Sequence, residues 1–416
     1  MKNKIMKYIL PNKFFEIEEV KLLISLLSEE NEESMFVGGI VRDLIKYNEC
    51  NRNDIDIATT LVPKKVVEIL TKNNIKPITI GMEFGSVSAI INDYNFDITT
   101  LRSELSYYGR KPNVVFTKDW LSDANRRDFT INAIYLNFEG EIFDPFDGKN
   151  DLLNGEVKFI GQSNDRINED PLRVFRYFRF LGEYSKTAPD KNSLLACSEL
   201  SFLISNLSKN RITSEFFKIL KIANPMYAID LMIEAGVLQE FFPQASRPDR
   251  LEFLCNLESS AGISPDPILR LASLIHVPDK GKKIIINKLK NIFIFTKKDL
   301  EKLSILLEKY TNFSENMDIV DIKKYLYKLN SHKIFFDVLL INWVKDGPSK
   351  DYRNIIEKVA NLEVPKFPIP RKKLHSLVEK KESISSIYKE LENFWIESGF
   401  EKNQKECISF LKKHIK

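Results

Sequence analysis

Two aspartates separated by a single residue, Asp54 and Asp56, are the first candidates for chemistry in this sequence. Side chains alternate between the two faces of a strand, so in an extended segment both carboxylates project from one face, about 7 Å apart. Carboxylate oxygens are ligands that Mg²⁺ prefers, and Mg²⁺ usually keeps substrate phosphates in its coordination shell. The pair therefore predicts a metal-dependent reaction at a phosphate group.

A pair of glycines, Gly38 and Gly39, precedes the aspartates and opens a helical pattern that carries Arg42 in its first turn. Glycine lacks a Cβ atom, so its backbone N–H can approach a phosphate closely, and a helix N-terminus attracts anions. Arg42 can donate hydrogen bonds to phosphate oxygens. Metal ligands, a phosphate cradle and a cation are the parts that phosphoryl transfer requires. Together the two motifs predict nucleotidyl transfer, whereas either motif alone is a common turn or surface pattern.

A basic pair, Arg126 and Arg127, stands before an apolar segment and could reach a triphosphate or a ribose. Asp128 and Asn132 follow closely and offer hydrogen bonds to sugar hydroxyls or to the arginines. Taken alone, this segment is equally typical of a solvated basic pair with a capping aspartate.

Three arginines recur at every third residue, at Arg173, Arg176 and Arg179, behind Asp170 and Pro171. Asp170 and Pro171 fit the N-cap and first position of a helix. Three neighbouring cations repel one another unless an anion lies among them. A carboxylate beside an arginine offers both acceptors and donors, so Asp170 and Arg173 could hydrogen-bond the Watson–Crick edge of a base. This arrangement predicts selection of the incoming nucleotide by protein side chains.

The surrounding segments predict a mixture of strands and helices up to about residue 160. Strands are expected at Met35–Val37, Asp54–Ala58, 75–80, 86–91, 96–101, Glu141–Phe143 and Val157–Ile160. Helices are expected over 16–29, after Gly39, from Pro63 onward and over Phe129–Tyr135, with a polar loop at 101–119. Beyond Gly161 almost every signal is helical. The predicted fold class is an α+β head with a mixed sheet, followed by an all-helical arm.

The overall composition is that of an ordinary folded chain. Its 416 residues suggest two to four domains, and 43% hydrophobic and 29% charged residues argue against extensive disorder. The net charge of +4 neither requires nor excludes a nucleic-acid partner, so any basic face must be local. The cysteines form no CxxC pair, which argues against zinc ribbons and favours reduced thiols in the cytoplasm. A secretory signal and a membrane span are not expected.

Five segments, in order, resemble the motifs of the class II tRNA nucleotidyltransferases, or CCA-adding enzymes, and of the related bacterial poly(A) polymerases. The segments are FVGGIVRDLI, NDIDIAT, RRDFTINA, DPFDGKNDLLNG and EDPLRVFRYFRF. The similarity covers about residues 34–182, and only a loose similarity extends beyond. A weaker match at NRITSEFFKIL resembles the helix that supports the base-reading pair of the family. The resemblance implies a DNA polymerase beta-like nucleotidyltransferase head over 1–160. It also implies a helical neck with the nucleotide-selecting helix over 161–240, and a tRNA-binding body and tail over 241–416.

The resemblance also implies roles for individual residues. Asp54 and Asp56 would be catalytic and would hold Mg²⁺, and Asp97 in the strand FDITT could add a third carboxylate. The flexible loop of the family corresponds to 101–112, where its usual Asp-Gly-Arg is replaced by Tyr108-Gly109-Arg110. The nucleotide-binding residues would be Gly39, Arg42, Arg126, Arg127, Asp170, Arg173, Arg176 and Arg179.

The activity implied is template-independent addition of CCA to the tRNA 3′ end from CTP and ATP, with release of pyrophosphate. A poly(A) polymerase is the main alternative, but the segment after Gly81, MEFGSVSAII, lacks the basic signature typical of those enzymes. An enzyme that adds only CC or only A is a further alternative, and the retained DxD argues against a catalytically silent RNA-binding protein. His276 is followed by valine, so no HD-type phosphohydrolase domain is expected. The basic stretches at 280–283 and 371–373 are candidate RNA contacts, and the chain could be a monomer or a homodimer.

Overall fold

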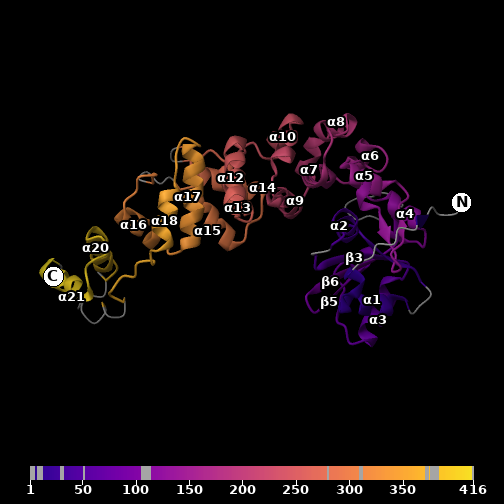
Figure 1. The fold of residues 1–416 in the computed structure, drawn as a ribbon, viewed down its shortest axis with the longest axis horizontal. Coiled ribbons are helices and arrows are strands. Elements are labelled where there is room, and N and C mark those ends of the chain that lie inside the picture. The colour runs from indigo at the N-terminus through magenta and orange to yellow at the C-terminus, as the bar shows by residue number, and fades with distance from the viewer. Residues whose placement is uncertain are drawn as a thin grey trace. The chain divides into compact units, whose positions relative to one another are not determined.

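The computed structural model describes residues 5–6, 13–28, 32–49, 52–104, 114–278, 281–308, 313–370, 374 and 384–414. The chain divides into two compact units, Met1–Pro243 and Gln244–Lys416 (Figure 1). The first unit holds the sheet and the helices that follow it, and the described part of the second unit is helical. The α+β head with an all-helical arm is therefore confirmed, while the finer boundaries at 160 and 240 remain predictions.

An eight-stranded mixed sheet forms the base of the first unit, in the order β1-β10-β9-β2-β3-β6-β5-β4. The central strands β3 and β6 run parallel, and the other neighbouring pairs are antiparallel. The predicted strands at the centre of the sheet are confirmed. The bounds are β1 (Ile5–Met6), β2 (Ser34–Val37), β3 (Asp54–Thr59), β4 (Pro77–Ile78), β5 (Ser86–Ile91), β6 (Tyr94–Thr100), β9 (Tyr135–Leu136) and β10 (Ile142–Phe143).

One face of this sheet is covered by helices α1 (Glu18–Ser28) and α3 (Pro63–Lys72), as drawn in indigo in Figure 1. Both helices are amphipathic and bury leucine, isoleucine and valine side chains against the inward-facing residues of β3, β5 and β6. Pro63 is the first residue of α3, where its missing N–H leaves no intrahelical bond unmade. Because that face is sealed by apolar contacts, polar residues of β3 and β6 must project from the opposite face.

Three segments depart from their predicted structure. The segment expected to be a loop contains an antiparallel pair, β7 (Arg102–Glu104) and β8 (Val114–Phe116), because the Val-Val-Phe run pairs with residues that follow β6. The helix predicted over Phe129–Tyr135 is wrong, since a single 3₁₀ turn (Thr130–Asn132) leads into β9 instead. Short apolar runs such as this one fit the residue periodicity of a helix and that of a strand equally well. Here pairing with the sheet determines that the run ends in a strand.

The segment Val157–Ile160, predicted as a strand, makes only one isolated bridge, between Phe159 and Phe129. The predicted loop motif Tyr108-Gly109-Arg110 lies outside the described residues.

Helix α7 (Leu172–Tyr184) is the centre of the helical part of the first unit. It packs against α9 (Lys209–Lys221) and α10 (Met226–Glu234), and the rings of Phe175, Tyr177 and Phe178 are fully buried. Its remaining faces carry the arginine row. The other helices of this part are α4 (Trp120–Asn125), α5 (Gly148–Asn154), α6 (Ser163–Glu169), α8 (Lys191–Glu199) and α11 (Val237–Phe241).

The second unit is built around α17 (His332–Asp346), which is apolar on nearly all sides and packs against several neighbours. None of the described helices is long and apolar enough to cross a membrane. The neighbouring helices are α12 (Pro248–Ala261), α13 (Pro267–Ser273), α14 (Lys282–Ile292), α15 (Lys297–Leu306), α16 (Ile319–Leu329), α18 (Arg353–Ala360), α20 (Ile384–Glu397) and α21 (Gln404–His414).

Candidate active site

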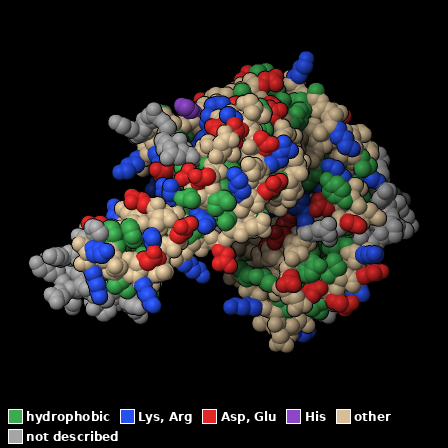
Figure 2. Space-filling model, turned by 60° about the vertical axis from the view of Figure 1, so that its left-hand side comes forward, with side chains coloured by type: hydrophobic (Ala, Val, Ile, Leu, Met, Phe, Trp, Pro, Cys, Tyr) green, Lys and Arg blue, Asp and Glu red, His purple; other side chains and the backbone are tan. Residues whose placement is uncertain are grey.

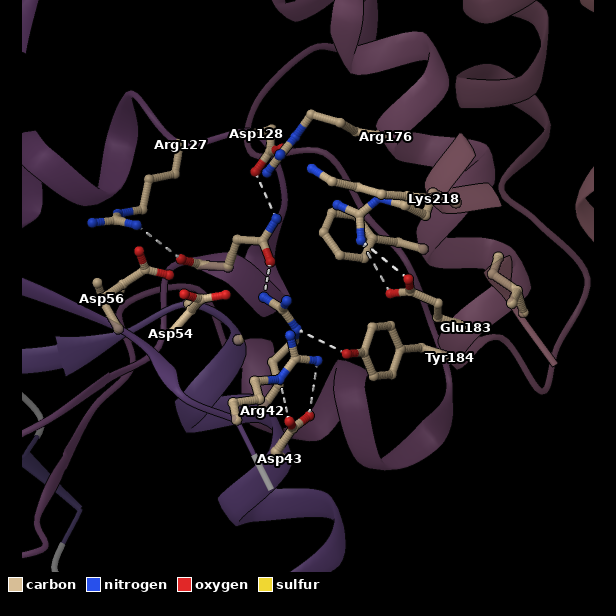
Figure 3. Close-up of a pocket in the computed structure, with 18 of the residues that line it drawn as sticks. Arg42, Asp43, Asp54, Asp56, Arg127, Asp128, Arg176, Glu183, Tyr184 and Lys218 are labelled. Atoms are coloured by element: carbon tan, nitrogen blue, oxygen red, sulfur yellow. Dashed lines mark hydrogen bonds and ion pairs between the residues drawn. The ribbon is translucent and has the colours of Figure 1, made fainter. Parts of the chain in front are cut away.

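The two aspartates of β3 occupy the solvent-facing side of the sheet. Asp54 and Asp56 are exposed while Ile55 and Ile57 between and after them are buried, so the predicted alternation is confirmed. Both carboxylates point into the cavity shown in Figure 3. Residue types and strand geometry together place two oxygen-donor groups side by side.

A third carboxylate lies on the adjacent parallel strand, where Asp97 is the register partner of Asp56. Asp97 accepts a hydrogen bond from the hydroxyl of Ser88 on β5. Although its side chain reaches solvent, Asp56 is surrounded by protein at the base of the cavity. This desolvation, followed by the negative charge of Asp97, raises the pKa of Asp56 above its ordinary value, against the opposing charges of Arg127 and Arg42. Negative charge is therefore concentrated at this point of the sheet. A bound divalent cation would reduce the repulsion among these carboxylates.

These donors fit Mg²⁺ as a pair and not as a closed cage. Across the described ranges, no group of three or more His, Cys, Asp or Glu side chains is placed to hold a metal ion. Mg²⁺ is typically held by one or two carboxylates, with waters and substrate phosphates completing its shell. The pair Asp54 and Asp56 matches that pattern.

The glycine pair brings a helix N-terminus to the aspartates. Strand β2 is antiparallel to β3 with Val37 opposite Asp56, and the chain turns at Gly38 with φ of +79° before α2 (Gly39–Tyr47) begins. The first amides of α2 therefore lie at the rim of the same cavity, beside Asp56.

The cavity has a volume of about 1380 Å³ and is lined by both the sheet and the helices of the first unit. The sheet side supplies carboxylates and the glycine turn, and the helical side supplies cations. Its charged and glycine lining includes Gly38, Gly39, Arg42, Asp43, Arg52, Asp54, Asp56, Arg102, Arg126, Arg127, Asp128, Arg176, Arg179, Glu183, Lys218 and Lys221.

Arg42 is held rigidly in the wall of this cavity. Its Nε donates to the hydroxyl of Tyr184 at 3.3 Å, and its guanidinium lies 5.0 Å from the ring centroid of Phe180. Its Nη1 donates to the side-chain oxygen of Asn132. The side chain is buried, so these partners fix its orientation toward the cavity.

A hydrogen-bonded chain continues from Asn132 to helix α7. Asn132 Nδ2 donates to Asp128 Oδ1 at 2.7 Å, and Arg176 Nε donates to Asp128 Oδ2 at 2.5 Å (Figure 3). Burial alone would raise the pKa of Asp128, but the charge and hydrogen bond of Arg176 outweigh it and lower the pKa to about 2. Asp128 is therefore an ionised link between the head and the arginine row.

Arg126 and Arg127 share one buried carboxylate, that of Asp123 in α4. Asp123 Oδ1 lies 2.5 Å from Arg126 Nη2, and its Oδ2 lies 3.0 Å from Arg127 Nη2. Arg127 also donates to the hydroxyl of Tyr135 at 2.9 Å. Sequence reasoning missed Asp123 as a functional residue, although its spacing of three and four residues before the arginines on a helix was the available signal.

Asp170 and Arg173 do not line the cavity, in contrast to the other predicted nucleotide-binding residues. Asp170 Oδ2 lies 2.7 Å from Arg211 Nη2, and its Oδ1 accepts from the amide of Leu172 at 3.1 Å. Arg173 is buried, pairs with Glu169 and donates to the backbone oxygen of Arg126 at 3.0 Å. In the structure, Asp170 and Arg173 are therefore each paired with a different protein group and not with each other.

Arg179 is clamped between two carboxylates. Its Nε donates to Glu215 Oε2 at 3.0 Å and its Nη1 donates to Glu183 at 3.2 Å. Lys218 shares Glu215 at 2.7 Å. Sequence reasoning also missed Glu183, Lys218 and the ion pair of Arg52 with Asp43, although Lys218 lies in NRITSEFFKIL and Asp43 in FVGGIVRDLI.

Comparisons with known proteins agree with this geometry. Residues 34–158 match the family described as the poly A polymerase head domain, and residues 188–247 match a probable RNA and SrmB-binding site of polymerase A. The mitochondrial CCA tRNA nucleotidyltransferase 1 of Mus musculus is 32% identical, over 95% of this chain and 90% of the mouse protein. The Homo sapiens counterpart is 31% identical over the same shares.

The fold agrees with a solved structure as well. The crystal structure of the Bacillus stearothermophilus CCA-adding enzyme in complex with CTP superimposes with a TM-score of 0.68, at 20% identity, covering 94% of this chain and 95% of that one. Sequence identity above 30% over nearly the whole length, a matching head domain and a matching fold lead to one conclusion. The chain belongs to the family of the CCA tRNA nucleotidyltransferases.

Proposed function

We infer that the chain adds the CCA end to tRNA, transferring CMP from CTP and AMP from ATP to the tRNA 3′-hydroxyl with release of pyrophosphate. The observation that carries this function is a single cavity with two aspartates of β3 on one side and a set of arginines on the other. The curated relatives are named for CCA addition, so a poly(A) polymerase is not favoured.

Asp54 and Asp56 are the residues that would hold Mg²⁺. The bound ion would make the 3′-hydroxyl a better nucleophile and would neutralise charge on the phosphate oxygens. The first amides of α2 at Gly39 and the guanidinium of Arg42 would bind the triphosphate, because both are fixed before the substrate arrives. Fixed donors reduce the reorganisation that the transition state would otherwise require.

Arg126, Arg127, Arg176 and Arg179 would complete the nucleotide site. Arg176 and Arg127 line the cavity and each has a buried carboxylate partner, Asp128 and Asp123. These partners keep the arginines extended toward the cavity and reduce their mutual repulsion. Arg179 is clamped more tightly by its two carboxylates, which favours a positioning role for it.

Asp170 and Arg173 would select the base. For that role Asp170 has to exchange its ion pair with Arg211 for the edge of CTP or ATP, and Arg173 has to release Glu169. A surface ion pair contributes only about 0–1 kcal/mol, so the exchange at Asp170 is energetically accessible.

The remaining assignments follow from the family and the composition. The head would comprise 1–160, the neck 161–240, and the tRNA-binding body and tail 241–416, with Mg²⁺, tRNA, CTP and ATP as ligands. A cytoplasmic location stays a prediction, because it rests on the scattered cysteines while two relatives are named as mitochondrial. The same applies to the choice between monomer and homodimer.

The direct test supplies purified protein with three tRNAs, which end before CCA, after C and after CC, together with labelled CTP or ATP. We expect C to be added to the first two and A to the third. Addition of long A tracts to an unrelated RNA would favour the poly(A) alternative. Failure on one of the three ends would instead identify a partial enzyme.

A further inference from the structure

Two cations of the second unit stand on helices that pack together, and the charge of one acts on the other. Arg250 belongs to α12 and Lys345 to the end of α17, and these two helices pack together through the rings of Phe253 and Trp343, whose centroids are 6.4 Å apart. Both side chains are partly buried. Within the described part of the chain, neither makes a side-chain hydrogen bond or an ion pair, and Arg250 Nε is buried without a partner.

The nearest carboxylates are already engaged elsewhere. Asp249, beside Arg250, lies 2.6 Å from Arg247 Nη2 and forms a bidentate contact with it. Asp346, beside Lys345, accepts from the hydroxyl of Tyr352. Asp249 and Asp346 therefore act on the two cations only through space, and neither forms an ion pair with Arg250 or Lys345.

Other buried cations of this unit are paired, which makes this arrangement notable. Arg270 lies 2.6 Å from Glu258, and Lys302 lies 2.8 Å from Asp266. Positive and negative side chains are also interspersed over the face drawn in Figure 2. Burial and then the charge of Arg250 lower the pKa of Lys345 to about 8. An anion placed between the two groups would reverse that effect.

We propose that Arg250 and Lys345 together bind one backbone phosphate of the RNA substrate. A guanidinium and an ammonium on two packed helices together offer several hydrogen-bond donors, and phosphate oxygens accept several charge-assisted hydrogen bonds at once. RNA helices are recognised mainly through shape, 2′-hydroxyl and phosphate contacts, which suits an all-helical unit without sequence readout. The proposal rests on the proposed function, because it takes the RNA to be tRNA.

The basic stretches singled out from the sequence are weaker candidates. Lys282 is paired with Glu308, so its charge is already compensated. Lys280 and the run 371–373 lie outside the described residues. The site therefore comes from two helices that are far apart in the sequence, which a search for basic runs cannot find.

The test measures tRNA affinity as a function of salt for R250Q, K345Q and the matched control R247Q. Arg247 precedes Arg250 by one turn and is engaged by Asp249, so R247Q removes a charge that is already in an ion pair. R250Q and K345Q are each expected to weaken binding about fivefold to tenfold near 0.1 M salt and to reduce the salt slope by about 1. R247Q is expected to bind almost as the wild type does, and K345R should retain most of the affinity.

Two further readouts separate binding from folding and from catalysis. R250Q and K345Q should keep or raise the melting temperature, because each removes one of two repelling cations. The KM for tRNA should rise while kcat and the KM for ATP stay unchanged. Equal affinity and equal salt slope in R250Q, K345Q and R247Q, with normal CCA addition by the wild type, would overturn the site alone. No CCA addition by the wild type would instead overturn the proposed function.

Inorganic phosphate separates a free-anion site from an RNA site. If millimolar phosphate shields Lys345 from acylation while R250Q and K345Q leave tRNA affinity unchanged, the pocket binds small anions and the RNA proposal is wrong. If tRNA shields Lys345 at concentrations near its Kd, and R250Q abolishes that shielding, the proposal is supported.

Discussion

The turn at Gly38 and the carboxylate of Asp56 fit against each other so closely that a side chain at Gly38 has no room. A Cβ atom built on Gly38 would lie 2.9 Å from Asp56 Oδ2, and the residue has a φ of +79°. The proposed phosphate cradle and the proposed metal ligand therefore belong to one structural unit. The glycine is required both for the backbone conformation and for the position of the carboxylate.

Gly38→Ala is expected to lower activity strongly, by at least about 100-fold, because the new Cβ displaces Asp56 from the metal position. It should also destabilise the fold by about 1–3 kcal/mol, because a φ of +79° with a ψ of −134° is a conformation that residues other than glycine rarely adopt. The matched control is Gly236→Ala, since Gly236 has a φ of +71° and no atom within 4 Å of its added Cβ. Urea unfolding and steady-state incorporation of CTP distinguish the two effects. Equal activity in both variants would contradict the coupling.

Asp54→Ala or Asp56→Ala should abolish nucleotide incorporation while tRNA binding stays nearly intact. Both carboxylates face the cavity and hold the metal in our proposal, whereas tRNA affinity depends on phosphate contacts elsewhere. A loss of about 10³-fold or more in kcat is expected from removing a group that stabilises charge in the transition state. Near-normal turnover of either variant in Mg²⁺ would show that the metal assignment is wrong.

Asp97→Asn tests whether the third carboxylate is a ligand or a neighbour. Asp97 is the register partner of Asp56 and accepts from Ser88. If it shares the metal, D97N should raise the Mg²⁺ concentration for half-maximal activity about tenfold. This matches the scale of outer-shell changes around metal sites. The control S88A removes only the hydrogen-bond donor. An unchanged Mg²⁺ requirement in D97N would leave Asp97 as a structural strand residue.

Part of this site could be predicted from sequence, because local patterns determine it. The alternation of β3 predicted that Asp54 and Asp56 share a face, and Gly38-Gly39 predicted the turn into α2. The chain of hydrogen bonds behind Arg42 could not be predicted in the same way. Arg42 and Asn132 are 90 positions apart, so their contact depends on how the helices pack onto the sheet.

The error over Phe129–Tyr135 has a similar cause. An apolar run of that length is compatible with a helix or a strand. The end of the run becomes a strand because Tyr135 and Leu136 pair with the edge of β2. Asp170 illustrates a second limit. Its place before α7 could be read from the sequence, and the resemblance linked NRITSEFFKIL to the base-reading pair. The individual ion pair of Asp170 with Arg211 could not be predicted, because it depends on how α9 packs against α7.

Asp123 should contribute to stability in a pH-dependent way. Burial alone would raise the pKa of Asp123, but the charges of Arg127 and Arg126 outweigh it and lower the pKa from 3.8 to about 2. A depressed pKa contributes stability above the unfolded value, and that contribution is lost as pH falls from about 4 toward 2. The shift corresponds to roughly 2 kcal/mol at about 1.4 kcal/mol per unit.

Measurement of unfolding free energies at pH 5 and pH 2 for the wild type and Asp123→Asn checks this expectation. The difference between the two proteins should shrink by roughly 2 kcal/mol on going to pH 2, because the carboxylate is then about half protonated in the folded wild type and almost fully protonated in the unfolded chain. A difference that stays constant with pH would mean that Asp123 titrates normally in the folded protein.

Asp170→Asn and Arg173→Ala are expected to relax base choice more than they slow the chemistry. Their hydrogen bonds would discriminate among base edges, while the phosphoryl transfer depends on Asp54 and Asp56. Loss of one partner should cost on the order of 1–3 kcal/mol of discrimination, or about tenfold to a hundredfold, because a mismatched edge leaves buried polar groups unpaired. Asparagine caps a helix about as well as aspartate, so D170N keeps the contact to the Leu172 amide while changing the donor pattern.

The measurement of base choice is kcat/KM for all four nucleoside triphosphates on a tRNA that lacks its 3′ end. Arg211→Gln is the matched control, because it breaks the ion pair with Asp170 without altering the proposed reading group. If Asp170 must leave Arg211 to reach the base, R211Q should keep the preference for CTP and ATP and should not lower kcat/KM for either. If D170N and R173A both retain that preference over UTP and GTP, the pair does not select the base. Asp170 would then serve to join α7 to α9, and Arg173 to fix Glu169 and the backbone at Arg126.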